Sequence, residues 1–320
     1  MDAFNKKIPL IAVVGPTASG KTALGIEIAR RLNGEVVSCD SMQIYKGMDI
    51  ASAKPTTDEM KGIPHHMIGI AEMSESYSVA RYVDEAKRVI SDIHSRNKMP
   101  ILVGGTGLYF SSLVDNLTFA EEEDTSELRA KLTAEAAEIG NEAMLKKLHE
   151  IDPEYAETLH PNNLKRIIRA LEVYYSSGVT MTEQQRRSRA NPSEYDLTAI
   201  GIRFENRELL YERINKRVDI MLENGLLDEA KESMSDGLAT SAQAIGHKEL
   251  IPFLKGECTL DEAVESLKRE TRRYAKRQMT WFNRDERINW ITADEADLKK
   301  LLENSIKVLE INGKCGIIAE

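Results

Sequence analysis

Eight consecutive residues near the N-terminus have the types and spacing of a phosphate-binding loop. Gly15, Pro16, Thr17, Ala18, Ser19, Gly20, Lys21 and Thr22 match the pattern GxxxxGK[ST], directly after a strand-like segment and before a helical one. The glycines let the main chain wrap closely, so that its N–H groups point at phosphate oxygens. Lys21 adds a full positive charge, and the Thr22 hydroxyl can ligate Mg²⁺. The pattern predicts binding of a di- or triphosphate, such as that of ATP or another nucleotide, together with Mg²⁺.

The acidic residue that usually completes such a site is missing. Enzymes that transfer phosphate carry a second carboxylate at the end of a later apolar strand, where it helps to hold Mg²⁺. Here the candidate strand, 101–103, runs into Gly104, Gly105, Thr106 and Gly107. Thr106 is either the N-cap of the next helix or a donor to a phosphate oxygen, and spacing does not decide between them.

Asp40 is the nearest acid, at the carboxyl end of the second expected strand. Ligands of open α/β sheets bind beyond these strand ends, so Asp40 and the phosphate loop should face one crevice. The carboxylate is either a turn residue or a general base that also positions an acceptor. Gln43 is close enough to hydrogen-bond a base edge. His65 and His66 are interpreted as polar loop residues, because no third metal ligand is in view.

Two arginines of the segment 207–224 flank its apolar stripe. Arg213 and Arg217 lie four residues apart, at the edge of the expected core. They could reach into the crevice and clamp a diphosphate. The alternative is a surface position, with pairing to Glu212 or Asp219.

Two further helical segments concentrate positive charge. In 162–177, one face carries Lys165, Arg166 and Arg169; in 260–283, a continuous face carries Arg269, Arg272, Arg273, Lys276 and Arg277. The formal net charge of −9 excludes a generally basic nucleic-acid binder but not local basic patches. These patches favour a polyanion such as RNA over simple solvated helix faces.

Strands that alternate with helices must position these groups. We expect strands at 8–14, 35–39, 100–104, 197–204 and 288–291, and helices at 21–32, 78–95, 206–224, 226–236, 260–283 and 294–310. The order predicts an α/β fold, a P-loop NTPase-like parallel sheet with flanking helices. Only helical periodicity occurs between 120 and 193, so an inserted all-helical subdomain is expected. The predicted domains are a P-loop core of 1–120 and 195–320 with C-terminal helices, and a helical insertion at 121–194 that begins with the acidic run Glu121–Asp124 and would bind an RNA partner.

Composition places this chain of 320 residues among folded, globular proteins. Apolar residues make up 42% and charged residues 30%, and the three cysteines lie too far apart for a disulfide framework. No leader-like segment and no stretch long and apolar enough for a membrane span occurs. We therefore expect a cytoplasmic protein without a membrane partner, and a monomer, because nothing demands a partner chain.

Six motifs occur together in this order: GPTASGKT, SCDSMQIYKGMDIASAKP, GGTGLYF, HPNNLKRIIRALE, QAIGHKE and RRYAKRQMTWF. As a set that spans nearly the whole chain, they resemble the tRNA dimethylallyltransferase (isopentenyl-tRNA transferase) family. That family transfers a five-carbon prenyl group from dimethylallyl diphosphate to N6 of the adenosine 3′-adjacent to the anticodon of tRNA. The resemblance implies the same donor, the same tRNA partner and release of diphosphate.

The resemblance also implies roles for residues of this chain. Thr17 to Thr22 would bind the diphosphate, Asp40 would be the general base, and Lys21, Thr106 and Arg217 would act on the diphosphate or the reacting centre. The tRNA contacts would be Asp40, Ser41, Met42, Gln43, Thr106, Arg129, Lys165, Arg166, Ile167, Ile168, Arg169, Gln243, Ala244, Ile245, Gly246, His247 and Lys248. His247 departs from the family pattern, since relatives commonly have Tyr there.

The missing second acid is explained if the loop binds a leaving group. As the carbon–oxygen bond breaks, negative charge grows on the diphosphate, and no phosphoryl group is transferred. The adenine amine then needs a carboxylate to take its proton, and Asp40 is the nearest candidate. Two alternatives stay open from the residues: a small-molecule kinase that uses ATP, and a non-catalytic RNA-binding or nucleotide-switch protein.

Overall fold

The computed structural model describes residues 7–119, 125–235 and 244–314. The chain divides into two compact units, one formed by Met1–Val114 with Ser193–Glu320 and one by Asp115–Pro192. The sequence predicts boundaries at 121 and 194; the acidic run Glu121–Asp124 lies outside the described residues. Among the helices of the described ranges, none combines the length and apolar character that crossing a bilayer requires.

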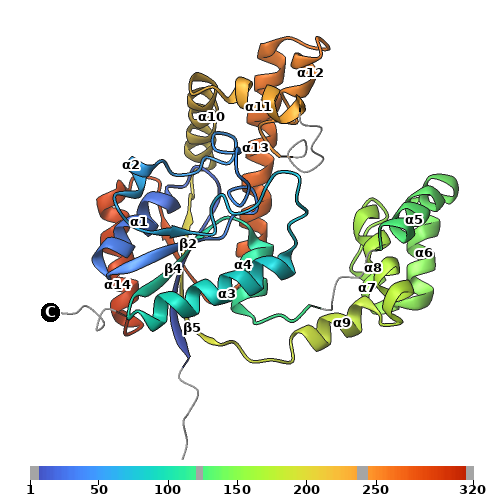
Figure 1. The fold of residues 1–320 in the computed structure, drawn as a ribbon, viewed down its shortest axis with the longest axis horizontal. Coiled ribbons are helices and arrows are strands. Elements are labelled where there is room, and N and C mark those ends of the chain that lie inside the picture. Colours follow the sequence, from blue (N-terminus) through green and yellow to red (C-terminus); the bar gives the residue numbers. More distant parts are fainter. Residues whose placement is uncertain (1–6, 120–124, 236–243, 315–320) are drawn as a thin grey trace, which may run out of the picture. The chain divides into compact units, whose positions relative to one another are not determined.

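The larger unit contains a parallel sheet of six strands (Figure 1). The strands are β1 (Ile8–Val14), β2 (Gly34–Ser38), β3 (His65–His66), β4 (Met99–Gly104), β5 (Tyr195–Arg203) and β6 (Ile288–Thr292). Their spatial order is β3-β2-β4-β1-β5-β6, and each neighbouring pair is parallel. The predicted parallel sheet is therefore confirmed, with β3 as a strand that the sequence analysis does not expect.

Helices cover both faces of the sheet because its central strands are apolar on both sides. One face of the sheet is covered by α3 (Val79–Ser95) and α4 (Gly107–Val114), and Leu10 and Ala12 of β1 join the core beneath them. The other face is covered by α1 (Lys21–Arg31) and α14 (Leu298–Ile311), and Ile11 and Val13 of β1 join the core there. Such two-sided burial is typical of parallel strands in α/β proteins.

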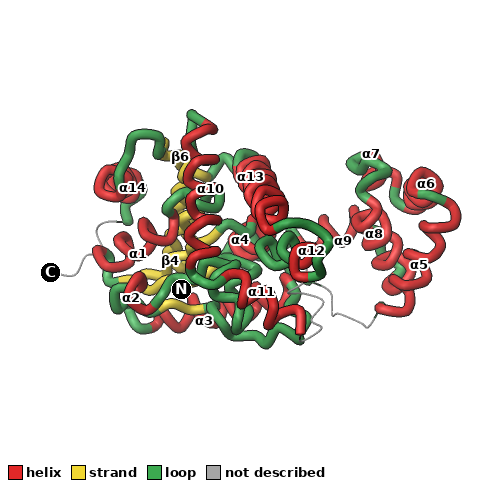
Figure 2. Tube along the Cα trace, turned by 90° about the horizontal axis from the view of Figure 1, so that it is seen from above, coloured by secondary structure: helices red, strands yellow, loops and turns green. Residues whose placement is uncertain are grey.

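A second group of helices rises beyond the carboxyl ends of the strands. It comprises α2 (Thr57–Met60), α10 (Arg207–Glu223), α11 (Leu226–Ser235), α12 (Ile251–Leu254) and α13 (Leu260–Phe282). Figure 2 shows α10 and α13 side by side over this edge of the sheet. The two helices therefore bring their side chains to the edge where α/β proteins bind ligands.

The smaller unit is entirely helical in its described part. Its helices are α5 (Ser126–Ile139), α6 (Asn141–Ile151), α7 (Pro153–Glu157), α8 (Leu164–Ser177) and α9 (Met181–Ser188). They enclose a separate apolar core that includes Leu132, Met144, Leu148 and Leu171. The unit therefore has a core of its own and does not extend the sheet.

Candidate active site

The phosphate-binding loop joins β1 to α1 in a conformation that requires its glycines. Gly20 has φ +91°, and Gly15 has φ +150° with the Ile202 carbonyl oxygen only 2.8 Å from where a Cβ would stand. No side chain caps the N-terminus of α1 at Gly20. The first N–H groups of α1 therefore remain available to an anion, which the helix dipole also favours.

Two partly buried cations face the cavity beside this loop. Lys21 and Arg217 both line it, and Lys21 also donates to the Pro16 carbonyl oxygen at 3.2 Å. Burial and the neighbouring Arg217 lower the pKa of Lys21 to about 8, against the opposing effect of Asp40. Burial likewise lowers the pKa of Arg217. Within residues 7–119, 125–235 and 244–314, neither cation has an ion-pair partner. The site is therefore short of negative charge.

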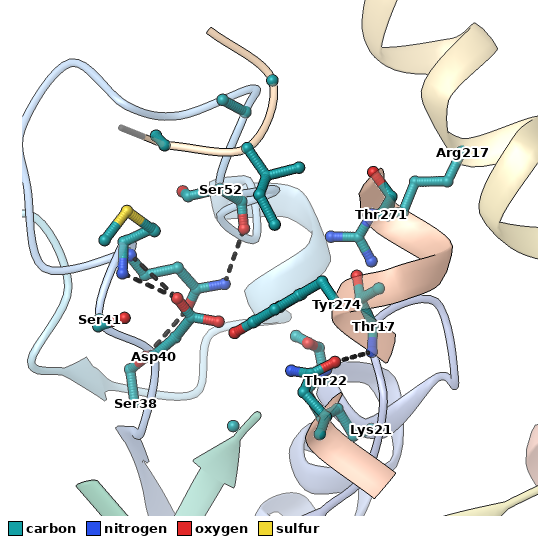
Figure 3. A pocket seen from close by; sticks show the side chains of 18 of the residues that line it. Thr17, Lys21, Thr22, Ser38, Asp40, Ser41, Ser52, Arg217, Thr271 and Tyr274 are labelled. Carbon is teal, nitrogen blue, oxygen red and sulfur yellow. Dashed lines mark hydrogen bonds between the residues drawn. The ribbon is translucent and has the colours of Figure 1, made fainter. Parts of the chain in front are cut away.

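Arg213 and Arg217 take different positions although they share one helix. The Arg213 Nε donates to the Ala18 carbonyl oxygen at 2.9 Å, and its guanidinium lies over the Phe204 ring. Arg213 therefore braces the phosphate loop from outside, while Arg217 points into the cavity (Figure 3).

Asp40 is a turn residue that also faces the cavity. Its Oδ1 accepts from the main-chain N–H of Met42 at 2.9 Å and of Gln43 at 3.4 Å, which is a turn interaction. The carboxylate nevertheless lines the same cavity as Lys21, and Figure 3 shows the Tyr274 ring extending towards it. A carboxylate anchored through one oxygen can offer the other to a ligand.

Thr106 is bound to the Asp40 segment rather than left free for a ligand. Its Oγ1 accepts from the Ser41 N–H at 3.0 Å and donates to the Ser41 hydroxyl at 3.3 Å. This bond joins the turn after β4 to the turn after β2. Thr106 does not line the cavity itself, and it reaches the cavity wall through Ser41 and through Tyr274, whose pKa its side chain lowers.

Steric contact explains why no acid follows β4. A Cβ on Gly104 would lie 2.1 Å from the Cys39 carbonyl oxygen, and a Cβ on Gly105 would lie 2.1 Å from the Gln278 Nε2. Neither position can carry a side chain without moving its neighbours. The close packing of β2 and α13 against this turn therefore excludes the second carboxylate of a phosphate-transferring site.

Two side chains of α13 belong to the site, and the sequence analysis does not assign them a role. The Gln278 Oε1 accepts from the Thr17 N–H at 2.8 Å, and its Nε2 donates to the Gly105 carbonyl oxygen at 2.9 Å. Tyr274 forms part of the cavity wall, and loss of solvation, with Asp40, raises its pKa above the ordinary value. Both residues lie in the motif RRYAKRQMTWF, and this motif is the sequence signal that could have indicated their place in the site.

The cavity has a volume of about 350 Å³ and an apolar part. Val103, Val218, Met221 and Leu267 line it along with the polar groups. A second cavity of about 820 Å³ adjoins it, and the two share Lys21, Thr22, Pro55, Arg217 and Met221. A small ligand with an anionic head and an apolar tail fits this combination of walls.

Some of the arginines on the expected basic face of α13 are engaged by neighbouring side chains. Arg272 donates to Asn215 of α10 at 2.6 Å, and Arg273 pairs with Glu270 at 2.5 Å. The Arg277 guanidinium lies over the Tyr274 ring, and both residues line the cavity. Lys276 is exposed. The face is therefore partly neutralised within its own unit.

In the smaller unit, the residues expected to contact tRNA divide into three groups. Arg129 and Arg169 both pair with the fully buried Glu172, at 2.8 and 2.7 Å. Ile167 and Ile168 are buried in the apolar core, so their side chains are not available to a partner. Lys165 and Arg166 are exposed and take part in no ion pair within the described residues.

The segment 243–248 lies against the cavity in its described part. Ala244, Ile245, Gly246 and Lys248 line the cavity, whereas His247 is 1% exposed and turns away from it. Gln243 lies outside the described residues. The burial of His247 leaves no ring face for stacking on a base.

His65 and His66 are held by protein groups. The His65 Nδ1 donates to the Ile63 carbonyl oxygen at 2.8 Å, and the His66 Nε2 bonds to Glu35 at 2.7 Å. Across the described part of the chain, no group of three or more His, Cys, Asp or Glu side chains could hold a metal ion.

Comparison with known proteins agrees with this geometry. The family model described as IPP transferase matches residues 43–285. A tRNA dimethylallyltransferase of Caldanaerobacter subterraneus subsp. tengcongensis is 50% identical over 308 residues, which are 94% of this chain and 98% of the relative. A tRNA dimethylallyltransferase of Acetivibrio thermocellus is 51% identical over 299 residues, 92% of this chain and 95% of the relative.

Solved structures give the same result. The full-length tRNA isopentenylpyrophosphate transferase from Bacillus halodurans is 43% identical, with a TM-score of 0.71 over 97% of this chain and 99% of that one. A eukaryotic dimethylallyltransferase acting on tRNA is 31% identical, with a TM-score of 0.76 over 95% of this chain and 78% of that one.

Proposed function

The chain belongs to the IPP transferase family, and on that premise we propose that it transfers a dimethylallyl group from dimethylallyl diphosphate to N6 of the adenosine 3′-adjacent to the anticodon in tRNA. Diphosphate is the second product. One observation of the structure carries the proposal: two partly buried cations without ion-pair partners in the described residues and one carboxylate share a partly apolar cavity.

The cations suit the leaving group. When the bond between the prenyl carbon and the bridging oxygen breaks, its electron pair stays on the diphosphate. Lys21, Arg217 and the first N–H groups of α1 supply positive charge where that negative charge grows. The apolar side chains beside them, including Val103 and Leu267, can hold the prenyl group. The same cavity therefore both stabilises the charge of the leaving group and holds the prenyl donor in place.

The carboxylate suits the acceptor. A carbon–nitrogen bond forms at N6, and the amine must then lose a proton. The second oxygen of Asp40 can take that proton, because only Oδ1 is held by the Met42 and Gln43 N–H groups. The target base must leave its stack to reach the cavity, which costs a few kcal/mol.

The residues present fit Mg²⁺. Mg²⁺ keeps several water ligands and needs one or two protein oxygens besides phosphate. Thr22 is the second residue of α1 and lines both cavities, and Asp40 lines one of them. When bound, Mg²⁺ would add positive charge to the departing diphosphate.

Lys165 and Arg166 of α8 are the best-supported tRNA contacts of the smaller unit, because they are exposed and unpaired within the described residues. The tRNA substrate favours a cytoplasmic enzyme. Every group that takes part in the chemical step comes from the larger unit of one chain, so the reaction needs no second copy, which supports a monomer.

The test is incubation with unmodified tRNA and dimethylallyl diphosphate, followed by mass spectrometry of the nucleosides. We expect one prenyl unit on one adenosine per tRNA. ATP and a panel of small hydroxyl acceptors serve as the control for a kinase. Consumption of ATP with an unchanged nucleoside profile would contradict the proposal.

A further inference from the structure

The segment 40–55 forms a wall of both cavities. It begins at Asp40 and lines the smaller cavity through Ser41, Met42, Gln43, Ala51 and Ser52. It lines the larger cavity through Asp49, Ile50, Ala53 and Lys54, and Pro55 lines both. The position of this segment therefore sets the space in which the base and the donor meet.

Side chains within the segment tie its start to its tip. The Gln43 Nε2 donates to the Ser52 and Ala53 carbonyl oxygens at 3.4 and 3.3 Å. The Lys54 Nζ bonds to the Tyr45 carbonyl oxygen and pairs with Asp49 at 2.5 Å. A displacement of the tip is therefore transmitted to Gln43, whose N–H contacts Asp40.

One carboxylate of α11 holds the tip. The Glu229 side chain accepts from the N–H groups of Asp49, Ile50 and Ala51 at 2.8, 2.7 and 2.9 Å. It is only 10% exposed. Burial alone would raise the pKa of Glu229, but the hydrogen bonds from His247, Ile50 and Ala51 outweigh burial and lower it. Glu229 is therefore an anion that accepts three successive main-chain N–H groups.

His247 completes this arrangement from a third segment. Its Nε2 lies 2.9 Å from the Glu229 carboxylate and acts as the donor, since an ionised carboxylate can only accept. The adjacent Gly246 has φ +114°, and a Cβ there would lie 3.1 Å from the Ala51 Cβ. Glu229 and His247 thus join the tip, α11 and the turn 244–250 around one point.

The tip is also packed against the helix that carries Arg217. Ile50 and Ala51 contact an apolar cluster that contains Val218 of α10 and Leu226 of α11. Arg217 precedes Val218 and points into the cavity. The Glu229 contact therefore fixes the wall relative to both Asp40 and the cation that faces the diphosphate.

We infer that Glu229, oriented by His247, is a positioning residue that holds the segment 40–55 in register with α10, so that Asp40 meets the donor at the correct distance. This inference rests on the proposed function. Glu229 and His247 contact no substrate, and they act by holding the segment 40–55 in place. Misplacing a reacting group by about 1 Å can cost on the order of 100-fold in rate.

The main test uses Glu229→Gln with Asp228→Asn as the matched control, because Asp228 is the exposed neighbour whose side chain is 78% accessible. The amide keeps an acceptor oxygen but loses the charge and turns an NH₂ group towards main-chain N–H donors. We expect kcat to fall on the order of 100-fold in Glu229→Gln, with the Kd of inorganic pyrophosphate changed by less than about threefold. The control should keep its kcat within about twofold. Pyrophosphate binding should persist because the phosphate loop and Arg217 lie outside the segment.

A second pair of variants tests His247. His247→Gln keeps an N–H donor near the Nε2 position, and His247→Met has similar length but no donor. We expect the Gln variant to retain most of kcat and the Met variant to lose it in part. Equal kcat values for the two variants would overturn the role given to His247.

Hydrogen exchange separates positioning from general loss of folding. In Glu229→Gln, the amides of residues 49–51 should exchange faster while those of β1 and β4 stay protected. An unchanged kcat, or a fall in pyrophosphate affinity equal to the fall in kcat, would overturn the inference. If the wild-type protein transfers no prenyl group, the proposed function fails, and the exchange of residues 49–51 still reports whether Glu229 holds the tip.

Discussion

The low pKa of Lys21 predicts that diphosphate affinity depends on pH. Loss of solvation and the neighbouring Arg217 lower the pKa of Lys21 from its ordinary value of 10.5 to about 8. This lowering corresponds to roughly 3 kcal/mol of unfavourable environment for the charged amine. A bound diphosphate reverses this effect, since an anion favours the protonated form.

The sign and size of the effect follow from protonation of the free enzyme. With a pKa of about 8, Lys21 is roughly nine-tenths protonated at pH 7 and one-tenth protonated at pH 9. Because the anion binds the protonated form, pyrophosphate affinity should fall about tenfold over this range. Calorimetry in two buffers of different ionisation enthalpy should also detect proton uptake on binding near pH 8.

Lys21→Arg is the control for titration of the ligand itself. An arginine stays protonated throughout this range, so any slope left in the variant belongs to pyrophosphate. The difference between the two profiles is the contribution of Lys21. Profiles with the same slope, or affinity that rises with pH in the wild type alone, would refute the electrostatic reasoning.

Three further experiments test the remaining groups. Asp40→Asn should lower kcat on the order of a thousandfold while tRNA affinity stays within a few fold, because only the proton acceptor is lost; a large fall in tRNA binding would contradict the assignment as a base. Gly104→Ser should destabilise the protein by about 1–3 kcal/mol in a denaturant titration, because its Cβ would lie 2.1 Å from the Cys39 carbonyl oxygen; an unchanged midpoint would contradict this steric account of the missing acid. Lys165→Ala with Arg166→Ala should reduce the slope of log K for tRNA against log salt by about 1 each; an unaltered slope would place the phosphate contacts elsewhere.

The sequence predicts the centre of the site because the decisive signals are local. The phosphate loop, the strand before it and the helix after it follow from a contiguous pattern around Gly15–Thr22. Asp40 is predicted from its place after a strand, since parallel strands end at one edge of the sheet. The parallel sheet follows from the alternation of strands and helices.

Contacts distant in the sequence could not be predicted. Arg213 and Arg217 share one helix and one spacing, and only the packing of α10 shows that one braces the loop and the other faces the cavity. β3 escapes prediction because two histidines carry no apolar alternation. Glu229 is one of 52 acidic residues, and nothing in its sequence neighbourhood indicates three main-chain donors 178 to 180 residues away.

The central claim is that carbon, and not phosphorus, is attacked in this site. Dimethylallyl diphosphate with a heavy oxygen isotope in the bridge between carbon and phosphorus distinguishes the two. Mass spectrometry of the products should find the whole label in the released diphosphate and a prenyl group on the tRNA. Label retained in a prenyl alcohol, or phosphate on any acceptor, would contradict the account.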